Sequence, residues 1–579
     1  MSNVPYQTQN LYQRIIARQG HYETKRQKYD DQNDVICELF RPDLVRGLIG
    51  QKEEGLFDNS KIVESTGPYS LQIWQRGFLG NMITRKADWF RDKLEEPEPW
   101  RGITFDGMDE VNTYLQDLDD HLSAMYRKSN YYDVMPEFVL DGGSVGSAVM
   151  LREYDPLEDR IVCKVPDYAS RWLDKDIFGY DNCLHVKWRW SALQAAAFFG
   201  KDNLPLAVKN QFDNGNHYDE TEYIQAIYGA GDPIFEGLEE SQSHPWLEYF
   251  VCCSAGETEQ EPLEPLNKGP GYFTRPFSSW HYHRNWHEVY SRTKAWFAVY
   301  DVRGANAYWE ALFSDAELNL RPPSWAMRTL QGLLDLSPGG ENYARTAQEY
   351  ENPPVYLQRP GNWAPAVDFA DRLKASIERW FDVPLFMMIS QLAQSRNQPE
   401  TKYGLMRMEA ERVGQVAPAV ETYEGQVLKN NHDAFMDIER SLEPAYPWGR
   451  LPEPPPVVQA HSNGRTKVEF MGQLSMAQVR DREILNFYRN LGTAEAVFTA
   501  SPETINKIRW PQALERVLEA GNFPQSELVP QDEYEQIIEA MRQRAMQQEL
   551  AEQAPKMAQA AKNLQGKTEE GSPLKAMAG

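Results

Sequence analysis

The chain has 579 residues, which is too long for one hydrophobic core and predicts about three to four compact units. A formal net charge of -25 argues against a protein that grips nucleic acid through a generally basic surface. With 16 Trp and 29 Tyr, the composition also excludes a largely disordered chain.

The cysteines and the apolar runs predict where the protein resides. Its five cysteines are odd in number and form no CxxC pair, which indicates a reducing cytoplasm and no disulfide framework. The N-terminus lacks a charged-then-apolar signal, and no apolar run approaches the ~18 residues that a membrane helix needs. We therefore expect a protein that is soluble and not secreted.

The first 155 residues are predicted to be mainly helical. Residues 1–47 have helical spacing with a stop near Arg41-Pro42, because the residue before proline is disfavoured in a helix. Residues 70–90 predict a second amphipathic helix that ends in an aromatic pair. A long helix from about Asp109 is expected to lead into two strands that are joined by a turn at residues 141–143.

The middle of the chain alternates strand and helix patterns. Residues 166–182 read as strand, turn and strand, and residues 190–211 as a helix that stops at Gly200 or Pro205. Residues 213–289 contain strand-like runs separated by acidic turns with Pro and Gly. Helix is expected to resume over residues 286–320.

A polar loop followed by a long helix is the most distinctive pattern, over residues 381–440. The helix should carry an apolar face, and Pro418 with Gly414 should bend it, because proline removes a backbone hydrogen bond. The apolar face consists of Val413, Val416, Val420, Tyr423 and Val427. Residues 449–463 are expected to be a proline-rich linker without helix, followed by a strand and a helix. Residues 534–564 predict a long helix rich in Ala, Gln and Glu, with a loose tail after it.

These segments, taken in order, resemble the portal proteins of short-tailed bacteriophages, which are head-to-tail connectors. The matching residues are Thr84, Trp89 and Phe90; Ser129 to Tyr132; Gly146, Ser147 and Ala148; Glu288, Tyr290, Ser291, Arg292 and Ala295; Leu318 and Asn319; Pro322 and Pro323; Leu336 to Tyr343; and Thr401 to Glu411. The chain departs from the family at Ser291, where glycine is usual, at Lys294, where proline is usual, and at Lys402, where an acid is usual.

The resemblance covers about residues 25–545 and implies a mainly helical α+β subunit of a ring, twelve-fold by analogy, with a central channel. The regions that it implies are a wing (1–189), a first stem helix (190–212), a clip (213–285), a second stem helix (286–320), the rest of the wing (321–465) with a tunnel loop (390–401) and a long kinked helix, a crown (466–533) and a C-terminal helix or barrel with a loose tail (534–579).

The implied function is a DNA channel at one vertex of the capsid, used for packaging and later for ejection. The implied partners are further copies of the chain, double-stranded viral DNA, the terminase large subunit, the major capsid protein, scaffolding protein, the tail adaptor and internal core or ejection proteins. Small amides and single basic residues suit a channel, because many lysines would hold DNA tightly. The candidate channel residues are Gln394, Ser395, Arg396, Asn397, Gln398 and Lys402 in the tunnel loop, and Lys294 and Arg303 in the stem.

Two other classes of function stay open. One is a structural head-tail adaptor without a channel. The other is a metal-dependent hydrolase, because His281, His283 and His287 have a spacing that is geometrically compatible with zinc, although no fourth ligand has motif spacing. The glycine-rich residues 141–147 lack the Gly-Lys-Ser/Thr of a phosphate loop. We therefore expect no cofactor and no enzymatic activity. The resemblance implies a place in the virion, at the portal vertex of the capsid, after synthesis in the host cytoplasm.

Overall fold

The computed structural model describes residues 10–44, 57–94, 109–236, 244–253, 265–266, 271–320, 324–325, 343–351, 353, 355–356, 363–387, 416–443, 445–462, 466–472, 534, 536–547 and 554. The chain divides into two compact units. The first unit comprises residues 1–91, 118–452 and 468–478, and the second comprises residues 92–117, 453–467 and 479–579. Helices and sheets are mixed, as the α+β expectation requires.

The N-terminal helix α1 (Leu11–Phe40) forms as predicted and ends just before Pro42. Its first turn is capped by Asn10, whose side-chain oxygen accepts a hydrogen bond from the Gln13 amide at 2.9 Å. One face packs on a sheet, where the Arg26 guanidinium donates to the Tyr168 carbonyl oxygen at 2.8 Å.

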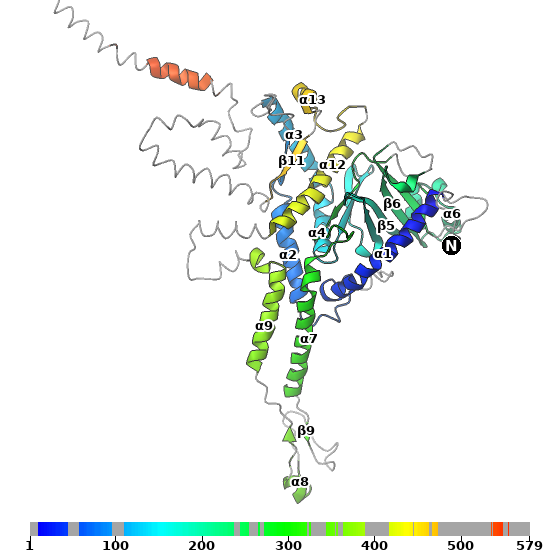
Figure 1. Cartoon of the computed structure of the whole chain (residues 1–579), viewed down its shortest axis with the longest axis vertical. Coiled ribbons are helices and arrows are strands. Elements are labelled where there is room, and N and C mark those ends of the chain that lie inside the picture. Colours follow the sequence, from blue (N-terminus) through cyan, green and yellow to red (C-terminus); the bar gives the residue numbers. More distant parts are fainter. Residues whose placement is uncertain are drawn as a thin grey trace, which may run out of the picture. The chain divides into compact units, whose positions relative to one another are not determined.

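Two antiparallel sheets form the centre of the first unit (Figure 1). The larger sheet has the order β4 (Arg171–Lys175), β5 (Asp181–Ser191), β6 (Glu220–Gly229) and β7 (Trp246–Cys252). The smaller sheet has the order β3 (Arg160–Lys164), β2 (Ala148–Asp155) and β8 (Phe277–Trp280). The predicted strand, turn and strand over residues 166–182 correspond to β4 and the start of β5.

Side chains that alternate along β5 belong to two different apolar clusters of the core. Cys183 belongs to the apolar cluster shared with α1, whereas Leu184 and Val186 belong to the cluster shared with Val149 and Phe277 of the smaller sheet. Successive side chains of a strand point to opposite faces, so the larger sheet is buried on both sides. This burial fixes β4 and β5, and with them the turn that connects the two strands.

The second predicted helix was placed too far along the chain. The helix α2 runs over Thr66–Met82, and Ile83 is extended (φ -133°, ψ 130°), so the helix does not continue to residue 90. The aromatic pair instead begins the strand β1 (Phe90–Leu94), which pairs with β11 (Thr466–Phe470). The Trp89 ring packs 5.2 Å from that of Tyr126, so aromatic packing outweighs the helical spacing.

The predicted turn between two strands at residues 141–143 was wrong. After α3 (Asp109–Lys128), a further helix, α4 (Tyr131–Gly143), ends there and a single strand, β2, follows. The glycines of this helix serve close packing, because a Cβ at Gly142 would collide with the Trp280 ring and one at Gly143 with the Trp74 ring. Glycine at this position therefore indicates contact with an indole and not a hairpin.

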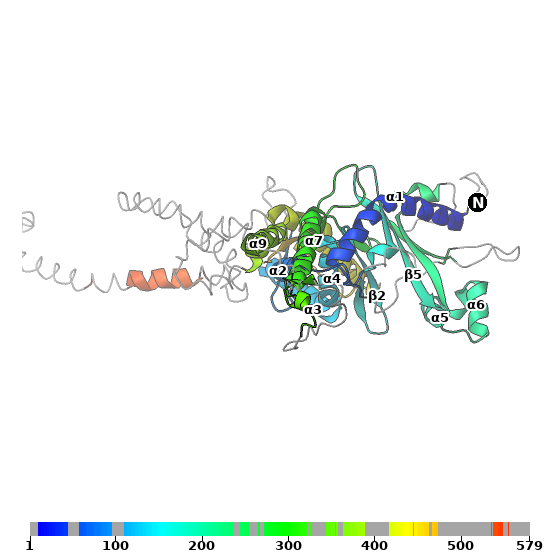
Figure 2. The same ribbon diagram turned by 90° about the horizontal axis from the view of Figure 1, so that it is seen from below.

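The predicted continuous helix at 190–212 is not found in the structure. The strand β5 continues to Ser191, and two short helices follow, α5 (Ala192–Phe199) and α6 (Leu206–Asp213), separated at Gly200 (φ 82°). Figure 2 shows both helices at one end of β5. The strands β6 and β7 of the expected clip pair with β5 in the main sheet, because their long apolar runs are buried on both faces.

Helix resumes at α7 (Lys294–Leu320) within the predicted range, and α9 (Trp363–Trp380) is a second long helix. Between them lie a short helix, α8 (Ala347–Glu351), and two short strands, β9 (Ser324–Trp325) and β10 (Val355–Tyr356). The strands pair antiparallel, with Val355 opposite Trp325. The chain therefore leaves along one helix and returns along the other.

The long helix after the predicted tunnel loop is described from residue 416 to 442 and contains a π-turn, η8 (Glu424–Leu428), which is followed by α12 (Lys429–Leu442). Its buried positions recur at every fourth residue, namely Tyr423, Val427, Asn431, Phe435 and Glu439. In an α-helix, residues four apart are rotated by about 40° around the helix axis, so four such steps move the buried positions by about 160°. The one extra residue of a π-turn reduces this rotation to about 60°. The π-turn therefore keeps one face on the core. The expected bend involves Gly414, which lies outside the described residues.

The C-terminal predictions were partly correct. The linker contains a helix, α13 (Pro456–Ser462), contrary to expectation, because proline is compatible with the first turn of a helix. The expected strand is β11, and residues 536–547 are helical within the predicted 534–564. Among the described helices, none has the length and apolar character to cross a membrane.

Candidate functional site

The helices α7 and α9 lie side by side (Figures 1 and 2). Near the start of α7, the Trp380 indole N–H donates to Asp301 Oδ2 at 2.9 Å, and the Trp380 ring stacks 6.1 Å from that of Phe297. Farther along α7, the Tyr308 hydroxyl donates to the Ala366 carbonyl oxygen at 3.1 Å. Later residues of α7 contact earlier residues of α9, so the two helices are antiparallel.

The first half of α7 is fixed to the rest of the first unit. Val302 and Asn306 are buried, and Asn306 Oδ1 accepts hydrogen bonds from the backbone amides of Val63 at 2.7 Å and Glu64 at 2.9 Å. A Cβ at Gly67 would meet the Val302 side chain at 3.1 Å, so glycine lets α2 approach this closely. These contacts anchor the helix over its first three to four turns.

The second half of α7 and the facing part of α9 expose apolar side chains. The exposed residues are Phe313, Leu318 and Leu320 of α7 and Val367 and Phe369 of α9. Single exposed apolar residues are normal, but several of them on one pair of helical segments favour association with another surface. In this helix pair, the first half of α7 is therefore anchored to the first unit, whereas the second half of α7 and the facing part of α9 expose apolar side chains.

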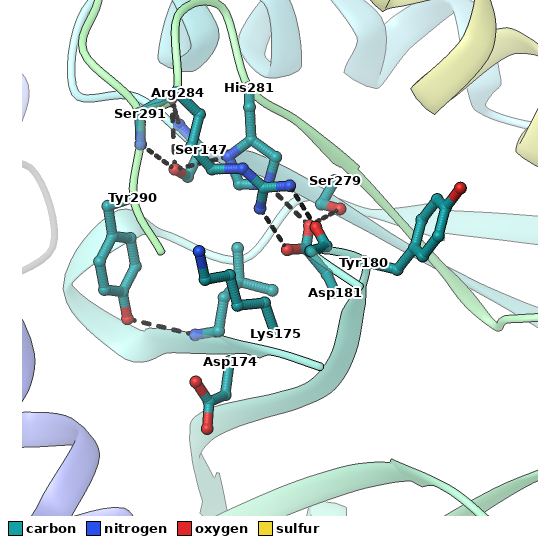
Figure 3. A network of polar contacts seen from close by, with 12 residues as sticks. Ser147, Asp174, Lys175, Tyr180, Asp181, Ser279, His281, Arg284, Tyr290 and Ser291 are labelled. Atoms are coloured by element: carbon teal, nitrogen blue, oxygen red, sulfur yellow. Dashed lines mark hydrogen bonds and ion pairs between the residues drawn. The ribbon is translucent and has the colours of Figure 1, made fainter. Parts of the chain in front are cut away.

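A buried polar network holds the loop that leads from β8 into α7 (Figure 3). Its centre is the Asp181 carboxylate, which His281 Nε2 approaches to 2.6 Å and to which Arg284 Nη1 donates at 2.6 Å. The Ser279 hydroxyl donates to the same carboxylate. Arg284 Nη2 also donates to the Gly179 carbonyl oxygen at 2.6 Å, so the network joins the β4–β5 turn to the loop before α7.

The other side of the imidazole meets two serines. His281 Nδ1 lies 3.1 Å from Ser147 Oγ. The Ser147 amide donates to Ser291 Oγ at 3.0 Å, and the Ser291 amide donates to Ser147 Oγ at 2.9 Å. Ser147 has φ 47° and follows Gly146 with φ 87°, where a Cβ would meet the Ser291 carbonyl oxygen at 2.6 Å. A glycine is thus required here, which explains the Gly-Ser pair.

The charges of the network set its protonation. Burial raises the pKa of Asp181, but His281 and Arg284 outweigh this and hold the pKa well below its usual range. The carboxylate is therefore ionised and accepts hydrogen bonds only, so His281 Nε2 carries a proton.

The Asp181 carboxylate, the His281 imidazole and the Ser147 hydroxyl are arranged like the triad of a hydrolase, but the residues around them do not form an active site. All three side chains are buried, and the Ser147 oxygen already accepts the Ser291 amide. A nucleophile must have room for a substrate carbonyl next to its oxygen. We conclude that this network supports the start of α7 rather than carrying out chemistry.

Further contacts continue this support. The Thr293 hydroxyl donates to the Ser144 carbonyl oxygen at 2.6 Å, directly before α7 begins. The π-turn also contributes, because Gln426 Oε1 accepts a hydrogen bond from the His281 amide at 2.9 Å. The loop that leads into α7 is therefore held by the segment before β2, the β4–β5 turn and the long helix.

The three histidines of the metal-dependent alternative do not share one site. His281 is buried against Asp181, whereas His283 and His287 are exposed. Among the described residues, no group of three His, Cys, Asp or Glu side chains is placed to hold a metal ion. The three histidines thus have different surroundings, and the spacing in the sequence does not translate into a shared site.

The candidate channel residues have different outcomes. Lys294 is 9% exposed, and its ammonium donates to Asp382 at 2.7 Å and to the Trp380 carbonyl oxygen at 3.0 Å. Burial lowers the pKa of Lys294, but Tyr282 and Asp382 raise it above its ordinary value, so the amine stays charged. Arg303 is exposed on α7. The tunnel-loop residues Gln394 to Gln398 and Lys402 lie outside the described residues.

Sequence reasoning missed the centre of the network. Asp181 and Arg284 had no motif around them, and Ser147 and Ser291 were noted for the resemblance alone. These residues come from positions up to 144 apart in the chain, so no local spacing reveals them. The unusual Gly-Ser pair before β2 was the one available signal.

Comparisons with known proteins agree with the resemblance. The sequence profile of the family described as bacteriophage head to tail connecting protein matches residues 12–529. The portal protein of Salmonella phage epsilon15 is 22% identical over 556 residues, covering 95% of this chain and 94% of that protein. The probable portal protein of Bordetella phage BPP-1 is 24% identical over 569 residues, covering 94% and 93%. The chain therefore belongs to the family of bacteriophage head to tail connecting proteins.

Proposed function

We propose that the chain is the subunit of a ring-shaped portal at one vertex of a phage capsid. The ring, twelve-fold by analogy, would form the channel through which the terminase packages double-stranded DNA, and later the site of tail attachment and the path of ejection. The observation that carries the proposal, beyond the family, is the antiparallel pair of α7 and α9, which is fixed at one end and uncovered at the other.

The pair provides a revised assignment of the stem. In place of residues 190–212 and 286–320, we assign the two stem helices to α7 and α9, and the clip to residues 321–362 between them. The contacts of Tyr308 with Ala366 and of Trp380 with Asp301 support a stem that is one rigid unit within each subunit. Under this assignment, β6 and β7 belong to the wing.

The exposed apolar side chains of the far half support assembly through the stem. Phe313 and Leu320 are seven residues apart and share one face of α7, and this face is stabilised when a neighbouring copy covers it. A ring satisfies this for every subunit, because each copy presents one surface to the next around a closed circle. Capsid, scaffolding, adaptor, core and terminase proteins would then bind to the outside and the ends of the ring.

The excess of acidic over basic residues supports a protein that lets DNA pass and does not bind it tightly. A net charge of -25 repels the duplex on average, while a few basic side chains make brief contacts with phosphates. In the stem we retain Arg303 as a candidate for such contacts, since Lys294 already pairs with Asp382. The tunnel-loop residues keep the same proposed role. ATP hydrolysis would belong to the terminase.

Imaging of the purified protein tests the proposal. Negative-stain class averages should contain rings with a central hole, and native mass spectrometry should give one dominant multiple of the subunit mass. A particle without a hole would favour the alternative of a structural adaptor without a channel. A protein that stays monomeric under mild salt would contradict both.

A further inference from the structure

The turn between β4 and β5 presents large apolar side chains to the outside, together with a neighbouring tryptophan. We call these four residues the tip patch: Ile177 (87% exposed), Phe178 (67%), Tyr180 (72%) and Trp286 (73%). Trp286 lies against the turn, because a Cβ at Gly179 would meet its ring at 3.0 Å. Turn residues are usually small and polar, so three exposed apolar residues out of five call for an explanation.

The turn that carries the tip patch is fixed by its own backbone. Asp176 Oδ1 accepts the amides of Phe178 at 2.9 Å and Tyr180 at 2.8 Å, and the Asp176 amide donates to the Tyr180 carbonyl oxygen at 2.8 Å. Gly179 adopts φ 87°, which a residue with a side chain rarely takes. The amides of Phe178 and Tyr180 are thus paired within the turn.

The buried network fixes the same turn from beneath. Arg284 donates to the Gly179 carbonyl oxygen at 2.6 Å, and the Lys175 ammonium donates to the Trp286 carbonyl oxygen. In Figure 3 the Tyr180 side chain points away from this network. The tip patch therefore lies on an ordered turn, and little backbone conformational entropy remains to be lost when a partner covers it.

The size of the tip patch indicates a protein partner. An aromatic side chain buries about 150–250 Å² when covered, so three of them with Ile177 supply roughly 500 Å² or more. A typical interface buries about 800 Å² per partner, and the tip patch alone would supply more than half of it. A small polar ligand would leave most of this surface in water.

We infer that the tip patch is a contact between neighbouring copies of this chain. The inference rests on the proposed ring, in which each subunit must meet its neighbours through two different surfaces. The tip patch continues towards the stem base, because Trp286 lies on the loop before α7 and the His283 ring on that loop packs 6.2 Å from Phe297 of α7. Phe297 is itself 43% exposed, so the base of α7 also carries an uncovered apolar side chain.

The test uses the full-length protein and one matched control. The double variant Ile177→Asp with Phe178→Asp places two charges in the tip patch, and Leu157→Asp changes a residue that is 94% exposed at the turn of a different hairpin, between β2 and β3. Mass photometry over a concentration series measures ring formation, and a thermal melt measures folding. We expect the double variant to require about 100-fold more protein for half assembly, and the Leu157 variant to match the wild type.

The outcomes separate the inference from the proposed function. If the wild type forms rings and the double variant forms them at the same concentration, the inference is wrong while the proposed ring stands. If the wild type forms no ring, the proposed function fails and the inference with it. A Leu157 variant that is equally impaired, or a lower melting temperature in both the double variant and the milder Phe178→Ser, would also overturn the inference, because the effect would not be specific to a contact between copies.

Discussion

Replacing Asp181 by asparagine removes the charge at the centre of the buried network but keeps the shape of the side chain. The carboxylate accepts from Arg284 and His281 at 2.6 Å each, and all of these groups are largely shielded from water. Breaking a buried ion pair on one side typically destabilises by about 3–5 kcal/mol, because the remaining charge keeps its desolvation penalty. We expect about 3 kcal/mol here, since the amide oxygen still accepts one hydrogen bond.

The effect of the Asp181→Asn variant should also depend on pH. The pKa of Asp181 is held well below its usual range, so its stabilisation is fully present above the unfolded value of about 3.9 and is lost as the pH falls towards the folded value. The difference between wild type and variant should therefore be constant from about pH 5 to pH 8 and shrink below about pH 4.

The assay is urea unfolding followed by tryptophan fluorescence at matched protein concentration, with midpoints compared at equal slope. Asp202→Asn, at an exposed position, is the control and should change the free energy of unfolding by less than about 0.5 kcal/mol. A loss below about 1 kcal/mol for Asp181→Asn at pH 7 would refute the view that this network fixes the base of α7.

Three further predictions follow from other residues. Burial lowers the pKa of His185 to about 3, so the unfolded chain alone binds a proton between about pH 6.5 and 3, and His185→Gln should remove up to ~1.4 kcal/mol per pH unit of acid destabilisation in urea titrations. An unchanged pH dependence would contradict this. Gln426→Ala should speed hydrogen exchange of the His281 amide about tenfold, because its acceptor is lost, and equal exchange would argue against the link. Arg396→Glu with Lys402→Glu should leave ring assembly and melting unchanged yet reduce DNA retention in reconstituted heads; normal retention would remove this loop from the channel.

Elements whose sequence pattern agrees with their packing were predictable. The helix α1 stops before Pro42 for a local reason, and the strand and turn signals around residue 176 match β4 and β5. Local spacing failed where distant aromatic rings decide the structure. Gly142 and Gly143 look like a hairpin turn until the Trp280 and Trp74 rings are known to press on them.

The site was less predictable than the fold, because its members come from different parts of the chain. Asp181, His281 and Ser147 meet only after two sheets have formed, and none of them stands in a motif that signals the others. The strands β6 and β7 were hard to place for a similar reason. Their apolar pattern predicts strands but not the partners of those strands, and the pairing with β5 is seen only in the structure. Family resemblance gave the correct class.

The central claim is that the α7–α9 pair forms the stem of a ring that encloses a channel. Electron cryomicroscopy of the purified full-length protein tests it most directly, because symmetry, hole and stem are seen together. We predict a ring with an open central passage, lined along part of its length by pairs of antiparallel helices, one pair per subunit. A closed particle, or a ring in which α7 and α9 lie on the outside and away from the passage, would contradict the claim.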